Sequence, residues 1–170
     1  MALFAVVLGS AVSSRAYGQG VASDQLLDIS TGFGSGVLRG GNGGLGVAQR
    51  APFFVDVTVL TPHPAEPWLL LGGSLRVELE DGRAVAGVAR ATLRHKLSKL
   101  ELRPGVAIPF YFAPRTMIGP EANFGIRYPV GNDFGLLAGA GIAAFMIGND
   151  VPHGTTVVMF HFQLGIGLLL

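Results

Sequence analysis

The final fourteen residues of the chain alternate between apolar side chains and small or polar ones. The segment from Val157 to Leu170 reads VVMFHFQLGIGLLL. Successive side chains of a β-strand point to opposite faces, so one face of this segment would be apolar along its whole length. That face carries Val158, Phe160, Phe162, Leu164, Ile166, Leu168 and Leu170, and the other carries Met159, His161, Gln163, Gly165 and Gly167. Such a strand needs an apolar environment on one side, which restricts the fold to a sheet packed on an apolar core or a sheet facing lipid.

The same two-residue alternation runs through most of the chain and predicts eight strands. Turn signals such as Asp81-Gly82 separate them. Most are long enough to cross a bilayer, which takes about 9–11 tilted residues. The expected strands are 27–37, 51–60, 69–80, 85–94, 100–112, 118–128, 134–146 and 157–170. Proline donates no ladder hydrogen bond, so four prolines leave the continuity of the fifth and sixth strands open. They are Pro104, Pro109, Pro120 and Pro129.

Composition excludes several classes of protein. Only 14% of the residues are charged and 49% are hydrophobic, whereas soluble domains have about 25% charged residues. Outside the N-terminus no apolar run reaches the roughly 18 residues of a membrane-spanning helix. There is no cysteine, which excludes disulfides and thiolate metal sites. A net charge of +1 provides no basic footprint for nucleic acid.

Every charged residue inside the expected strands lies on the face opposite the apolar row. Six acidic residues and five arginines share this face, so their charges nearly cancel. They are Asp28, Asp56, Arg76, Glu78, Glu80, Arg90, Arg94, Glu101, Arg103, Glu121 and Arg127. Near-balanced numbers are what mutual ion pairing of confined charges requires.

Two architectures fit this division of faces. In a soluble sandwich the charged face would meet water and the apolar faces would meet each other. In a membrane barrel the apolar face would meet lipid and the charged face would line the lumen. The barrel is favoured because the strands exceed the usual sandwich length of about 5–6 residues. The charged face also uses Arg, which suits confined bidentate pairing, rather than Lys. Its glycines would leave room in a narrow lumen for long side chains.

These features resemble the eight-stranded OmpA/OmpX-like bacterial outer-membrane β-barrels. The resemblance covers residues 27–170 and rests on strand count, alternation, a charged interior and the C-terminal strand. The last residue departs from the family pattern, because Leu170 stands where an aromatic residue is usual. It implies an all-β, antiparallel, up-and-down transmembrane barrel in the bacterial outer membrane, with periplasmic termini. External loops are then expected at 39–48, 81–82, 113–116 and 147–154, and periplasmic turns at 61–67, 95–99 and 131–133.

The N-terminus is predicted to be a secretory signal peptide covering residues 1–18. Ala2 to Val12 is an apolar stretch of signal length, and the following SSRAYG supplies small residues for cleavage. The positively charged start that such signals usually carry is missing. Residues 19–170 would then form the barrel domain.

An eight-stranded lumen is just wide enough to be filled by side chains. We therefore expect a structural charge network rather than an open pore, formed by Asp56, Arg76, Glu78, Glu80, Arg90, Arg94, Glu101, Arg103, Glu121, Arg127 and His161.

Catalysis is weighed at two places in this network. His161 faces the expected lumen, and barrel-type acylases and deacylases pair a His with a Ser, but His161 has no Ser two residues away. The carboxylates of Glu78, Glu80 and Glu121 could form an acid–base or metal cluster, although neighbouring arginines favour ion pairing. The loop histidines lack metal-ligand spacing. We expect no enzyme activity, no cofactor and no metal.

The sequence therefore predicts a small integral, porin-like outer-membrane protein with a structural or interaction role, or at most narrow solute passage. Its partners would be outer-membrane lipids and the barrel assembly machinery, which would read the last strand; a monomer is expected. The alternative is a soluble periplasmic or secreted β-sandwich or lipocalin-like binding protein, and a third hypothesis is a barrel-type lipid-modifying enzyme.

Overall fold

The computed structural model describes residues 25–39, 45–48, 53–79, 84–113, 116–149, 151 and 153–170. The expected signal peptide, Glu80 and the Asp81-Gly82 turn lie outside the described residues. The described part consists of β1 (Leu26–Arg39), β2 (Leu45–Ala48), β3 (Phe53–Pro62), β4 (Leu69–Glu78), β5 (Val85–Leu93), β6 (His95–Leu97), β7 (Leu100–Ala113), β8 (Met117–Ile118), β9 (Glu121–Pro129), β10 (Phe134–Phe145) and β11 (Thr156–Leu169). No helix in this part is long and apolar enough to cross a bilayer.

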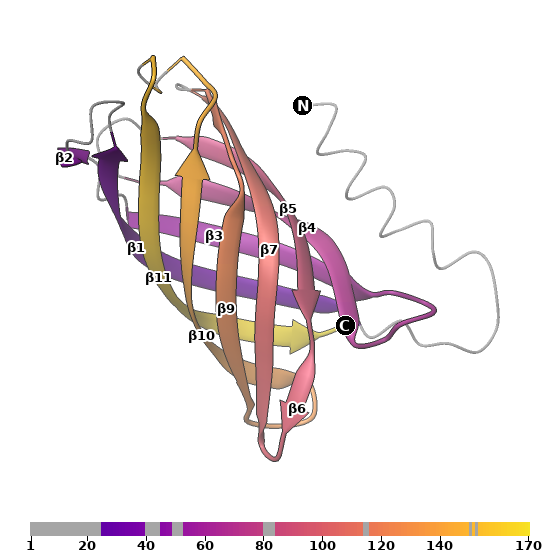
Figure 1. Ribbon diagram of the computed structural model, residues 1–170. Helices are drawn as coiled ribbons and strands as arrows, with labels where there is room; N and C mark the ends of the chain where they lie inside the picture. The colour runs from indigo at the N-terminus through magenta and orange to yellow at the C-terminus, as the bar shows by residue number, and fades with distance from the viewer. Residues whose placement is uncertain are drawn as a thin grey trace.

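Eight of these strands form a closed circuit (Figure 1). The order is β1, β3, β4, β5, β7, β9, β10 and β11, and β11 pairs back with β1 along the whole of both strands. All pairings are antiparallel. Closure removes the free edges that an open sheet would present. The predicted eight-stranded antiparallel barrel is therefore confirmed.

The barrel has two distinguishable ends. The start of β1 pairs with the end of β11, Leu26 opposite Leu169, so both termini of the barrel lie together. We call this the terminal end; it also carries the β3–β4 and β9–β10 connections. The opposite end, which we call the loop end, carries the start of β11 and the end of β10.

The polarity of the barrel is the inverse of that of a soluble protein. Outward side chains are apolar and exposed, and Leu164, Phe33 and Val106 have exposed fractions of 67%, 62% and 61%. Inward side chains include buried Asp56, Arg76 and Glu121. A soluble sandwich or lipocalin-like protein would need its apolar side chains inside, so neither alternative describes this structure.

The fifth expected strand is continuous and the sixth is interrupted. Within β7, Pro104 lies between Leu102, which pairs with β6, and Gly105, which pairs with β5. Pro109 lies beside the gap between β8 and β9. Because the neighbouring strand is interrupted at both places, the missing N–H groups remove little from the ladder. Gly119-Pro120 forms the break between β8 and β9, and Pro129 is the last residue of β9.

Two connections contain more strand than the sequence predicted. The expected external loop at 39–48 includes β2, which pairs with the end of β1. The expected turn at 95–99 includes β6, which pairs with β7 and extends the hairpin past the rim. The turn itself narrows to Ser98 and Lys99, with Ser98 at a positive φ of 54°. The turn at 95–99 was predicted too long because His95, Lys96 and Leu97 continue the ladder opposite Leu102, Glu101 and Leu100.

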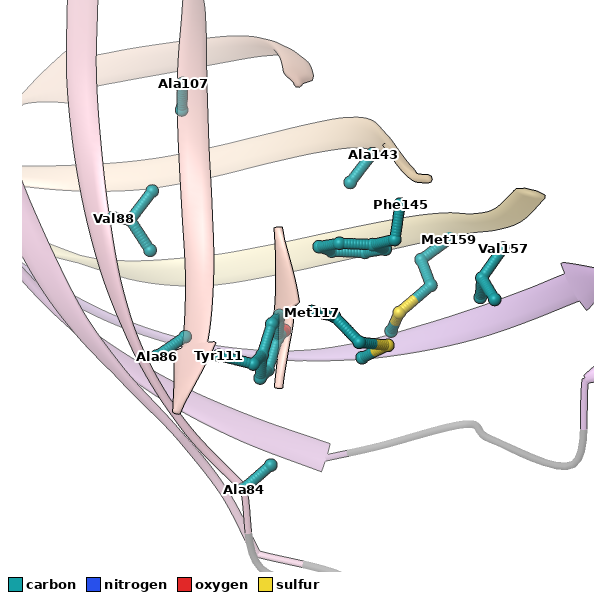
Figure 2. Close-up of a cluster of buried hydrophobic side chains, with 10 residues drawn as sticks. All are labelled: Ala84, Ala86, Val88, Ala107, Tyr111, Met117, Ala143, Phe145, Val157 and Met159. Carbon is teal, nitrogen blue, oxygen red and sulfur yellow. The ribbon is translucent and has the colours of Figure 1, made fainter. Parts of the chain in front are cut away.

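Apolar side chains fill the interior near both ends. At the loop end, Tyr111 packs edge-on against Phe145, with ring centroids 5.5 Å apart. Figure 2 shows these rings beside Met117 and Met159, with small side chains from β5, β7 and β10 around them. At the terminal end Leu26, Leu60 and Leu70 form a second, smaller cluster with Leu169 packed against it.

Candidate functional site

The middle of the lumen holds two acidic residues and two arginines in mutual contact. Arg76 lies 3.0 Å from Asp56 and 3.1 Å from Glu121, measured between the charged atoms. Arg90 lies 2.7 Å from Asp56 and 3.5 Å from Glu121. All four side chains are almost fully buried. We call this set the central network; each charge has two partners of opposite sign, which is the condition for tolerating buried charge.

Neighbouring side chains support the central network. Register places Arg76 directly opposite Asp56 on adjacent strands, while Glu121 comes from the other side of the barrel on β9. The Arg76 guanidinium also lies 4.8 Å from the centroid of the Phe54 ring, a cation–π contact. Arg90 Nε donates to Ser74 Oγ at 3.0 Å. Closure of the sheet, rather than proximity in sequence, therefore assembles the network.

His161 lies at the edge of the central network. Its Nε2 is 3.7 Å from Glu121 Oε1, and its ring packs edge-on against Phe54 with centroids 5.8 Å apart. Ser74, which lies on the same face of β4 as Arg76, accepts a hydrogen bond from Arg90. Within the described residues His161 contacts Glu121 and Phe54 rather than a serine, and this geometry supports an interior role for the histidine.

A second group of charges lies nearer the terminal end. Arg103 Nη1 donates to Asp28 Oδ2 at 2.7 Å, and Arg103 Nε donates to Glu101 Oε1 at 2.6 Å. Arg94 Nε donates to the other Glu101 oxygen at 3.0 Å. Arg127 lies in the same group, directly opposite Glu101 in register. We call Asp28, Arg94, Glu101, Arg103 and Arg127 the terminal cluster.

The terminal cluster is not fully paired within the described residues. Arg127 is only 6% exposed, yet its Nε and Nη2 have no hydrogen-bond partner. Arg103 Nη2 and Asp28 Oδ1 are also without a hydrogen-bond partner. Three arginines face two carboxylates here, so the cluster carries one excess positive charge.

Glycines make space for the long side chains, as expected. A Cβ added at Gly135 would lie 2.7 Å from Arg127 Nε, and one added at Gly141 would lie 2.4 Å from the His161 ring. At Gly167 an added Cβ would lie 2.5 Å from Asp28 Oδ1. Larger residues at these positions would have to displace a charged or aromatic side chain of the interior.

The interior has little free volume between the central network and the apolar side chains at the loop end, which include Tyr111 and Phe145. A cavity of about 10 Å³ lies there, lined by Phe54, Arg76, Glu78, Tyr111, Phe145 and His161 among others. A cavity needs about 10–15 Å³ to hold one water molecule. The space therefore suits a single water at most and no larger solute.

The structure places all but one of the predicted network residues inside the barrel. Glu80 lies outside the described residues, and Glu78 is buried and lines the cavity. The prediction treated the charges as one network, but they fall into two groups. The predicted network also left out Asp28, although the alternation of the first strand placed this side chain inward. In the structure Asp28 contacts Arg103. Among the described residues, no group of three or more His, Cys, Asp or Glu could hold a metal ion.

Comparison with known proteins agrees with this architecture. The structure of neisserial surface protein A matches with a TM-score of 0.65 and 12% sequence identity, covering 89% of this chain and 100% of that one. The N-terminal β-barrel domain of OprF from Pseudomonas aeruginosa matches with a TM-score of 0.51 and 10% identity, covering 87% of this chain and 98% of that one. No protein-family model matches the chain, and no curated protein matches it.

These likenesses and the closed circuit define the class of the fold, which is a small eight-stranded transmembrane β-barrel. The architecture expected from the resemblance to OmpA/OmpX-like barrels is confirmed. At these identities the likeness concerns the fold, and function has to be argued from this chain's own lumen and surface.

Proposed function

We propose that this protein is an integral component of a bacterial outer membrane with a structural or interaction role, and that it performs no catalysis. The observation that carries the proposal is the inverted polarity, with an apolar outer face and a charged interior. In water such an outer face would expose far more contiguous apolar surface than a soluble monomer carries. In a bilayer the same face is matched to lipid chains, and closure satisfies the backbone groups that lipid cannot.

The terminal end would face the periplasm. Barrels of this class have short periplasmic turns, and the connection between β9 and β10 spans only 130–133. Trp68 and Tyr128, which are about half exposed, lie at this end, where amphipathic aromatics favour the membrane–water interface. Recognition of β11 by the barrel assembly machinery and a monomeric state stay predictions.

The lumen would not conduct ions steadily. The Tyr111–Phe145 pair, the two charged groups and the cluster of Leu26, Leu60 and Leu70 all occupy the interior. Passage of even a small solute would require several buried side chains to move together. Narrow solute passage is therefore the weaker of the two roles considered.

Refolding of residues 19–170 into detergent, followed by gel electrophoresis with and without boiling, tests the barrel in isolation. A compact, SDS-resistant band that shifts on boiling is expected.

The refolded protein is then inserted into a planar bilayer beside a Tyr111→Ala/Phe145→Ala variant. We expect no steady conductance from the wild type and increased conductance or leakage from the variant.

Steady wild-type channels would contradict the closed lumen, and a chain soluble without detergent would contradict the membrane location. Fractionation of cells that express the full chain checks the location directly, since recovery in the outer-membrane fraction is required.

A further inference from the structure

The terminal cluster has the donors and the charge of an anion-binding site. Arg103 and Arg127 are about nineteen-twentieths buried, and three of their N–H-bearing nitrogens have no partner. A buried donor without a partner destabilises the folded state, and the effect is larger when the donor is charged. The described residues thus leave both a positive charge and several oriented donors to be satisfied by something else.

The free groups are close to one another. A Cβ built on Gly167 would lie 2.5 Å from Asp28 Oδ1 and 3.4 Å from Arg127 Nε, so both atoms lie close to this glycine. Gly135 lies directly opposite Gly167 in register, beneath the same guanidinium. Arg103 donates to Asp28 through Nη1, and the Nη2 of the same guanidinium has no hydrogen-bond partner.

The cluster is also near solvent. The side chains of Arg94 and Asp28 are 17% and 12% exposed, whereas those of Asp56 and Glu121 in the central network are 1% and 0% exposed. The terminal cluster is therefore more accessible to a small ion than the central network is.

The chemistry of the free atoms selects among anions. Arginine N–H groups would bind any oxyanion, with a preference for carboxylate and phosphate geometry. Asp28 Oδ1 is an acceptor, and it would repel an anion that carries no proton. A ligand that satisfies all the free atoms must accept from the arginines and also donate one hydrogen bond to Asp28.

We propose that the terminal cluster binds hydrogen phosphate or a singly protonated phosphate monoester, with Arg103 and Arg127 donating to its oxygens and Asp28 accepting from its P–OH group. Sulfate has the same shape but no proton at neutral pH, so Asp28 would discriminate against it. The proposal depends on the barrel fold and not on the proposed cellular role.

Titration calorimetry on the refolded full-length barrel in an uncharged detergent tests the site. Sodium phosphate and sodium sulfate are added at constant ionic strength. We expect saturable phosphate binding and at least tenfold weaker sulfate binding.

Arg127→Gln should weaken phosphate binding about tenfold to a hundredfold, the usual effect of losing hydrogen bonds from a charged donor. Lys99→Gln, which removes a positive charge from the exposed hairpin at the same end, is the matched control and should bind as the wild type does.

Two further variants separate the site from general effects. Arg127→Lys keeps the charge but loses the planar fork, so it should fold even if Arg127→Gln does not, and it should still bind phosphate more weakly. Asp28→Asn should abolish the preference for phosphate over sulfate. Each variant is first checked for heat-modifiability. Phosphatidic acid added in mixed micelles distinguishes a lipid headgroup from the free ion: competition with inorganic phosphate indicates a shared site.

No saturable binding of inorganic phosphate or phosphatidic acid to the wild type would overturn the proposal. So would equal binding of phosphate and sulfate, or an equal loss in Arg127→Gln and Lys99→Gln.

Discussion

Replacement of Arg76 by methionine provides the most direct test of the central network. Arg76 is 3% exposed and contacts both Asp56 and Glu121 at about 3 Å. Its removal leaves two buried carboxylates with Arg90 as their remaining arginine partner. Breaking a buried ion pair from one side costs about 3–5 kcal/mol because an uncompensated charge stays behind. We expect Arg76→Met to lower the free energy of unfolding by about this amount.

The double variant Arg76→Met/Glu121→Gln is the informative comparison. It removes one charge of each sign and leaves the 2.7 Å Arg90–Asp56 pair intact. Because neutral replacements of a buried pair are often tolerated, the double variant should be more stable than Arg76→Met alone. The coupling between the two sites should be about 0.5–3 kcal/mol, the range for residues in one network.

Denaturant unfolding in lipid vesicles measures these differences. Trp68 is the single tryptophan of the chain, and its fluorescence should report its transfer from the membrane interface to water. Losses that simply add in the double variant would show that the lumen is well hydrated and that the charges are independent. That result would refute the account of the interior as a dry, mutually paired network.

Other substitutions test the lipid-facing surface and the glycines of the lumen. Leu164→Arg should lower the free energy of unfolding in lipid by about 2–4 kcal/mol because Leu164 is exposed near the middle of β11. Val130→Arg at the terminal rim is the control and should cost about 0–1 kcal/mol. Equal costs in vesicle unfolding would mean that the membrane register is misplaced. Gly141→Ala should lower the free energy of unfolding by about 1–3 kcal/mol because the added Cβ would meet the ring of His161. His161→Ala in the same background should recover part of that stability. No recovery would place the strain elsewhere.

The strand pattern could be predicted from the sequence because each face of these strands meets one environment. Outward positions meet lipid and inward positions meet the lumen, so the period of two survives along nearly every strand. This is why the inward placement of Arg76, Glu101 and Glu121 followed from alternation alone. Irregular places were harder to predict, because whether a proline is tolerated depends on its neighbouring strands. Pro109 is acceptable only because β8 and β9 leave a gap beside it.

Pairing between charges could not be predicted from the sequence. Glu121 and Arg76 are 45 residues apart, and Arg103 and Asp28 are 75 residues apart. Alternation assigns all of them to one face, but it does not state which level of the lumen each one reaches. That level depends on strand register around the closed circuit, to which every hydrogen-bonded pair contributes. The division into a central network and a terminal cluster, with its excess of one arginine, therefore came only from the structure.

The sequence by itself determined that this chain forms long two-faced strands with all strand charges on one side, because local alternation is a property of neighbouring residues. Tertiary structure alone decided which charges meet, which donors stay free and how little space is left in the lumen. Those properties depend on where side chains from opposite walls of the barrel come together, and closure of β11 onto β1 sets those positions.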